Sequence, residues 1–219
     1  LFGLGKSGDD ANPLGIGVLA RSLPAGNYKF EDGGSELAEL GWAMGGYSFD
    51  RYRNGPKQTP RLVTKETPEL QRLTQAVFLT RDLINTPAND MGPEQLEKTF
   101  RKLASYHKAK VTAVKGDQLL KKNFPMVHAV GRASSDAPRV LDMVWGKASH
   151  PKVTLVGKGV TFDTGGLNIK PGSSMALMKK DMGGAATVLG LARMIMAMDL
   201  PVRLRVLIPA VENAVAGVA

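Results

Sequence analysis

The strongest constraint on the fold is an alternation of strand-like and helix-like segments that begins near Thr67 and continues to residue 210. The strand-like segments are residues 109–115, 125–131, 139–146, 152–157 and 202–210. The segments with helical spacing of apolar residues are 67–84, the stretch from Pro93 onward, 117–123 and 184–198. This alternation predicts an α/β fold in which helices flank both faces of a mixed sheet.

Two of the helix starts carry local signals. Thr67 is a suitable N-cap and Pro68 follows at the first helical position, where a missing N–H costs nothing. Pro93 starts the next helix after the breaker segment NTPANDMGP, residues 85–93. The sequence therefore predicts two consecutive helices here.

The region before Thr67 is rich in Gly and Pro and only weakly periodic. Residues 34–49 are its best helical candidate, and residues 53–63 are typical of a loop that ends in a short strand. The expected apolar face of that helix consists of Leu37, Leu40, Ala43 and Met44.

Composition excludes several classes of protein. The 219 residues include no Cys, which rules out a disulfide scaffold and a thiolate metal site and fits a reducing, cytoplasmic location. No run of 18 apolar residues occurs, so no membrane-spanning helix is expected. The first residues lack the arrangement of a signal peptide.

The formal net charge of +9 raises the question of nucleic-acid binding. The Lys and Arg residues are scattered, and only 6% of the residues are aromatic, too few for a base-stacking platform. The pattern argues against nucleic acid as a partner.

Two short patterns carry no function on their own. GLGKSG, residues 3–8, matches a glycine-rich phosphate loop, but the following DDANPLGIG does not start a helix promptly, as such a loop requires. The three histidines lie far apart in the sequence, and His128 falls in a strand-like segment, where a structural role is expected.

Residues 155–186 concentrate charged side chains on glycine-rich turns. Lys158 follows the strand-like segment 152–157, and ligands of open α/β sheets bind at the carboxyl ends of strands. Asp163 is expected in a turn before one glycine pair, and Asp181 in a turn before another. Paired glycines allow backbones to approach closely, and carboxylates are oxygen ligands for divalent metal ions.

A lysine beside carboxylates has two interpretations. It can form an ion pair, which contributes little at a surface. It can also lose its proton and bind a metal ion as a neutral amine. Spacing alone favours the ion pair, because structural ion pairs also gather charged groups.

A longer comparison changes that balance. The stretch VGKGVTFDTGGLNIKPGSSMALMKKDMGGAATVLG resembles the signature of the leucyl aminopeptidases, or cytosol aminopeptidases, a family of two-metal exopeptidases. LINTPANDMGP (83–93) and LIPAVENAVAG (207–217) resemble segments of the same family in the matching order. The resemblance covers residues 67–217 well and 1–66 only loosely.

The resemblance implies a role for each residue of the site. Asp163 is similar to the carboxylate that bridges two divalent ions, Zn or Mn. Lys158 and Asp181 resemble further ligands of one of those ions. Lys170 resembles a catalytic lysine that stays off the metal and polarises the scissile carbonyl, and Met178 resembles a wall of the substrate pocket. Ordinary core packing remains an equal alternative for Met178.

The resemblance also implies a whole-protein function: removal of an N-terminal residue, preferably leucine or another apolar residue, from peptides by a cytoplasmic homohexamer. It implies a residual N-terminal α/β domain in residues 1–66 and the first part of a catalytic domain in 67–219, which begins with a linking helix at 67–84.

The family continues to a second motif, N-T-D-A-E-G-R, which brings the remaining Asp and Glu ligands and an arginine that holds bicarbonate. This sequence stops at Ala219 before that motif, which favours a partial record of a longer chain over a true fragment. An inactive fragment and a DNA-binding relative of the family are the alternative functions.

Overall fold

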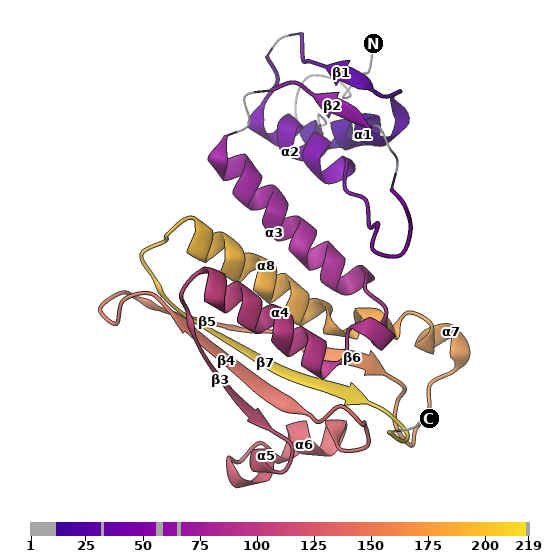
Figure 1. Cartoon of the computed structure of the whole chain (residues 1–219), viewed down its shortest axis with the longest axis vertical. Coiled ribbons are helices and arrows are strands. Elements are labelled where there is room, and N and C mark those ends of the chain that lie inside the picture. Colours follow the sequence, from indigo (N-terminus) through magenta and orange to yellow (C-terminus); the bar gives the residue numbers. More distant parts are fainter. Residues whose placement is uncertain (1–11, 32, 56–58, 65–66, 218–219) are drawn as a thin grey trace. The chain divides into compact units, whose positions relative to one another are not determined.

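The computed structural model describes residues 12–31, 33–55, 59–64 and 67–217 (Figure 1). The chain divides into two compact units, Leu1–Phe78 and Leu79–Ala219, and the division falls inside helix α3 (Pro68–Asn85). The segment GLGKSG lies outside the described residues. No described helix has both the length and the hydropathy needed to cross a lipid bilayer.

The first unit contains a pair of short parallel strands and a small core. Its elements are η1 (Pro13–Val18), α1 (Leu19–Ser22), β1 (Gly26–Tyr28), α2 (Glu36–Gly45) and β2 (Pro60–Leu62). The predicted helix within 34–49 is confirmed as α2. Its predicted apolar face is wrong at Leu37, whereas Leu40, Ala43 and Met44 are partly buried. Leu37 is 54% exposed, whereas Ala38 and Trp42, four residues apart, are buried. The bulky Trp42 sets the buried face.

The predicted helix start at Thr67 is confirmed. The Thr67 hydroxyl accepts a hydrogen bond from the Leu70 backbone N–H at 3.2 Å, and Pro68 is the first residue of α3. The predicted start at Pro93 is also confirmed, since Pro93 opens α4 (Pro93–Tyr106).

The second unit is built around a five-stranded mixed sheet. Its helices are η2 (Ala88–Asp90), α4, α5 (Gln118–Lys121), α6 (Pro125–Gly131), α7 (Gly172–Met175), η3 (Met178–Met182) and α8 (Gly183–Ala197). Its strands are β3 (Lys110–Lys115), β4 (Arg139–Trp145), β5 (Lys152–Val156), β6 (Gly159–Asp163) and β7 (Arg203–Asn213).

Strand β7 organises this sheet. It pairs antiparallel with β4 along one edge, and β4 pairs antiparallel with β3. Along its other edge β7 pairs in parallel first with β5 and then with β6. The strand order β3-β4-β7-β5, with β6 also on β7, confirms the predicted mixed α/β sheet.

The main core lies between the sheet and the helices α4 and α8. Phe100 and Leu96 from α4, Leu189 from α8 and Leu204 from β7 are fully buried there. Figure 1 shows the short helices α5 and α6 on the other side of the sheet. Alternate residues of the central strands face the core, as expected for a sheet packed by helices.

Two local predictions are wrong. Residues 125–131 form helix α6 and not a strand, because Pro125 favours the first helical turn and a short apolar run does not distinguish helix from strand. His128 therefore lies on a helix, 3.2 Å from Asp117 Oδ1. Asp163 does not lie in a turn but ends β6, a strand whose pairing depends on the distant β7.

Candidate functional site

The site begins at an interruption in the sheet. Strands β5 and β6 pair with consecutive stretches of the same edge of β7, and Gly157 and Lys158 lie between them. Lys158 does follow its strand, as predicted, but the chain then rejoins the same edge. The break turns the Lys158 backbone away from regular pairing and places it beside the start of α8.

Helix α8 approaches this break closely. The Ala185 N–H, in the first turn of α8, donates to the Lys158 carbonyl at 2.9 Å. A β carbon on Gly184 would lie only 3.0 Å from the Lys158 backbone nitrogen. The glycine pair that opens α8 therefore permits a close backbone approach, as the sequence predicts.

Lys158 and Asp181 form the first charged pair of the site. Lys158 Nζ lies 2.7 Å from Asp181 Oδ1, and Asp181 lies in η3, which packs beside β6. The second oxygen, Oδ2, is buried and has no hydrogen-bond partner among the described residues. A buried carboxylate oxygen without a donor is costly unless something else binds it.

Asp163 and Lys170 form the second pair, at 3.1 Å between Asp163 Oδ2 and Lys170 Nζ. The loop that returns Lys170 to the strand end contains Gly165 and Gly166, with φ of 90° and 62°. These values favour glycine. The Lys170 N–H then donates to the Thr164 carbonyl at 2.9 Å and closes the loop.

The Asp163 carboxylate is held in its charged form. Burial alone would raise the pKa of this group, but the donors around it outweigh burial and lower the pKa below its ordinary value. Those donors are the Gly165 N–H at 3.0 Å, the Asn213 amide at 2.7 Å and Lys170. The carboxylate is thus available as an anionic ligand at neutral pH.

Met178 is the first residue of η3 and is partly buried. It is absent from the described main core, whereas Met182, the last residue of the same helix η3, is fully buried in that core. Its predicted place in a substrate pocket stays a prediction.

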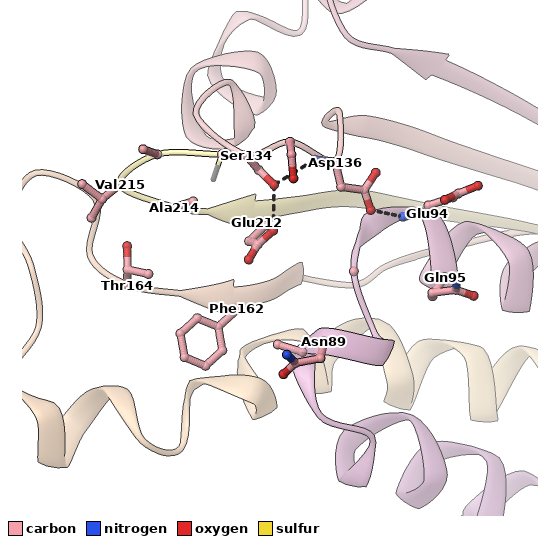
Figure 2. A pocket seen from close by; sticks show the side chains of 15 residues that line it. Asn89, Glu94, Gln95, Ser134, Asp136, Phe162, Thr164, Glu212, Ala214 and Val215 are labelled. Atoms are coloured by element: carbon pink, nitrogen blue, oxygen red, sulfur yellow. Dashed lines mark hydrogen bonds between the residues drawn. The ribbon is translucent and has the colours of Figure 1, made fainter. Parts of the chain in front are cut away.

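A separate cavity of about 750 Å³ lies near the ends of β6 and β7 (Figure 2). Phe162 and Thr164 line it, but Asp163, between them, does not. Glu212 accepts a hydrogen bond from Ser134 Oγ there at 2.7 Å. The cavity is therefore distinct from the two lysine–aspartate pairs.

The donor set fits a divalent metal ion. It comprises the unpartnered Asp181 oxygen, the anionic Asp163 and the Lys158 amine beside Asp181. Carboxylate oxygens and an amine nitrogen are ligands for Zn²⁺ or Mn²⁺. Within the described part of the chain, no three His, Cys, Asp or Glu side chains lie close enough together to hold a metal ion by themselves.

Sequence reasoning missed Asn213 and Thr164. Asn213 meets Asp163 only because β6 pairs with the end of β7, about 50 residues later in the chain. Thr164 directly follows Asp163, and its hydroxyl donates to the Asn213 carbonyl through the same pairing. In the sequence, only the polar residues that end β7 could have indicated that this segment reaches the site.

Comparison with known proteins identifies the family. Residues 78–219 match the profile described as "Cytosol aminopeptidase family, catalytic domain". The chain belongs to the cytosol aminopeptidase family. Residues 4–65 match the profile "M17 aminopeptidase, N-terminal domain". The resemblance inferred from the motifs is confirmed, and the first unit contains the family's N-terminal domain.

The relatives are longer than this family member. A probable cytosol aminopeptidase from Corynebacterium glutamicum is 34% identical over 236 residues, covering 98% of this chain and 47% of the relative. The crystal structure of cytosol aminopeptidase from Coxiella burnetii shares 47% identity with a TM-score of 0.87, covering 92% of this chain and 46% of that one. The chain spans about half the length of these relatives or less.

A third relative was solved with a metal ion. The bottromycin maturation enzyme BotP, solved in complex with Mn, is 31% identical with a TM-score of 0.81. The alignment covers 96% of this chain and 50% of BotP.

Proposed function

We propose that the protein is a metal-dependent aminopeptidase that removes the N-terminal residue of peptides, preferably leucine or another apolar residue. The observation that carries this proposal is the buried, unpartnered Oδ2 of Asp181. Asp181 pairs with Lys158 and lies in η3, which packs against β6, the strand that ends at Asp163. Family membership and the Mn-bound BotP relative support it. We further propose a cytoplasmic homohexamer that holds two divalent ions and a bicarbonate ion.

In this proposal three residues hold the metal. Asp163 would bridge both ions, and Lys158 and Asp181 would bind one of them. The metal pair would supply Lewis acidity, which polarises the scissile carbonyl and activates water. Lys158 must give up its proton to bind, so metal binding releases protons.

Lys170 has a different task. Its ammonium group lies 3.1 Å from Asp163 Oδ2. A protonated lysine donates a hydrogen bond to the substrate carbonyl oxygen as negative charge develops on it. Met178, three residues before Asp181 in η3, would contact the first side chain of the substrate.

The test compares metal content with activity in the full-length protein. We expect a strong chelator to abolish hydrolysis of a leucine anilide and added Mn²⁺ to restore it. Asp163→Ala should lose both ions, and Asp181→Ala only one. Asp117→Ala is the matched control, because the Asp117 side chain is 93% exposed and pairs only with His128 in the described structure.

The proposal fails if chelation leaves hydrolysis unchanged. The bridging role of Asp163 alone fails if both aspartate variants lose the same number of ions in elemental analysis.

A further inference from the structure

Asn213 ends β7 directly beside the proposed metal ligand Asp163. The two residues are register partners in the parallel β6–β7 pair, so their side chains project from neighbouring strands. Asn213 Nδ2 donates to Asp163 Oδ1 at 2.7 Å. This is the shortest of the described hydrogen bonds to that carboxylate.

The strand pairing does not depend on this amide group. The Asn213 backbone carbonyl accepts separate hydrogen bonds from the Thr164 N–H at 3.0 Å and the Thr164 hydroxyl at 2.8 Å. A change of the Asn213 side chain therefore removes the contact with Asp163 and keeps the bonds that hold the strand ends together.

The glycine turn limits the space around the amide. A β carbon on Gly166 would lie 3.1 Å from Asn213 Oδ1, so the turn and the amide are closely packed. The Gly166 N–H donates to the Thr164 hydroxyl at 3.1 Å and holds that turn in place. The amide is thereby kept with its nitrogen toward Asp163.

The two oxygens of Asp163 are consequently not equivalent. Oδ1 accepts from both the Gly165 N–H and the Asn213 amide, whereas Oδ2 contacts only Lys170 among the described residues. Two donors on one oxygen fix the rotation of the carboxylate group.

We propose that Asn213 is a positioning residue that orients Asp163 and leaves Oδ2 as the oxygen presented to the metal and to Lys170. The inference rests on the proposed function, because it assumes that Asp163 is a metal ligand. Hydrogen-bond partners of ligating carboxylates tune metal affinity, and their loss costs about 10–100-fold.

The test measures Mn²⁺ affinity of the full-length protein by the electron paramagnetic resonance signal of free Mn²⁺. Asn213→Ala removes the donor, and Asn213→Leu removes it while keeping a similar shape. We expect both variants to bind Mn²⁺ about 10–100-fold more weakly. Asn168→Ala, an exposed asparagine of the same loop region, is the matched control and should bind as the parent does.

A spectroscopic measurement separates positioning from general loosening. The visible spectrum of the Co²⁺-loaded protein should change in both Asn213 variants and not in Asn168→Ala, while thermal unfolding of the metal-free variants stays close to that of the parent. If one of the two Asn213 variants does not fold, the other still tests the proposal.

Asp163→Asn distinguishes failure of the positioning role of Asn213 from failure of the proposed metal-dependent function. If Asp163→Asn loses Mn²⁺ but both Asn213 variants keep parental affinity and Co²⁺ spectra, the positioning role is wrong and the proposed function stands. If Asp163→Asn also keeps parental affinity, both are wrong.

Discussion

Two charged clusters of the second unit differ in how completely their oxygens are paired. Glu97 accepts from Arg101 through Oε1 at 2.8 Å, and from Arg139 at 2.8 Å and Lys115 at 2.7 Å through Oε2. Arg139 also bonds Asp136 and the Ala137 carbonyl. In the lysine–aspartate site, Asp181 has one partner and one buried oxygen without any.

Exposure differs in the same direction. The Glu97 and Arg139 side chains are each 5% exposed, whereas the Lys158 side chain is 60% exposed. A buried cluster with every oxygen paired stabilises the fold, while a pair with a free oxygen and an exposed partner can exchange its contacts for a ligand. The completeness of pairing, more than the presence of charge, separates the Glu97 cluster from the Lys158–Asp181 pair.

The sharpest way to break this comparison is to remove Arg139. We expect Arg139→Ala to lower the free energy of unfolding by about 3–5 kcal/mol, because it removes a donor from the buried Glu97 carboxylate and from the partly exposed Asp136 carboxylate. Urea denaturation measures the loss. Arg205→Ala is the control, since the Arg205–Asp142 pair is half-exposed and should contribute about 0–1 kcal/mol. Equal losses in the two variants would contradict the comparison.

Lys170→Ala should affect catalysis and leave the fold intact. We expect turnover to fall about 10²–10³-fold with both metal ions retained, because an electrostatic donor is lost and no ligand is removed. Steady-state kinetics and elemental analysis on the same preparation decide the matter. Lys180→Ala, an exposed lysine of η3, should keep parental turnover. Loss of a metal ion in Lys170→Ala would make Lys170 a ligand.

The pH dependence of stability should identify Glu97. Burial raises the pKa of this carboxyl, but hydrogen bonds from Lys115, Arg139 and Arg101 outweigh it and lower the pKa from 4.5 to about 2. The stabilisation is present above pH 4.5 and is lost as the pH falls toward 2, by about 3 kcal/mol in total. Urea denaturation between pH 6 and 2 should show a smaller decline for Glu97→Gln than for the parent. Parallel declines would rule out this assignment.

Asp181→Ala should have the smallest effect on stability. In metal-free protein we expect the free energy of unfolding to change by about 1 kcal/mol or less, because the Lys158 pair is exposed on one side and an unpaired buried oxygen disappears. Denaturation in the presence of a chelator tests this. A loss of unfolding free energy as large as that of Arg139→Ala would show that Asp181 stabilises the fold as the Glu97–Arg139 cluster does.

The sequence predicted the elements that depend on local signals. The start of α3 at Pro68 and of α4 at Pro93 followed from proline and cap positions. The glycine-rich surroundings drew attention to Lys158, Asp163, Lys170 and Asp181, but their proposed roles came from the family resemblance and stay predictions. Elements that depend on distant pairing were missed: β6 requires β7, and the Asn213–Asp163 bond requires their register. For α6, a seven-residue apolar run did not distinguish helix from strand.

The central position of β7 has a consequence for synthesis on the ribosome. Strands β5 and β6 pair only with β7 within the described sheet, yet β7 begins about 40 residues after β6 ends. At typical elongation rates of about 5–20 residues per second, both strands wait roughly 2–8 s with open edges before their partner emerges. During that interval the nascent chain exposes apolar strand residues such as Val153 and Leu155, a target for chaperones, and neither charged pair has yet been placed against the complete sheet.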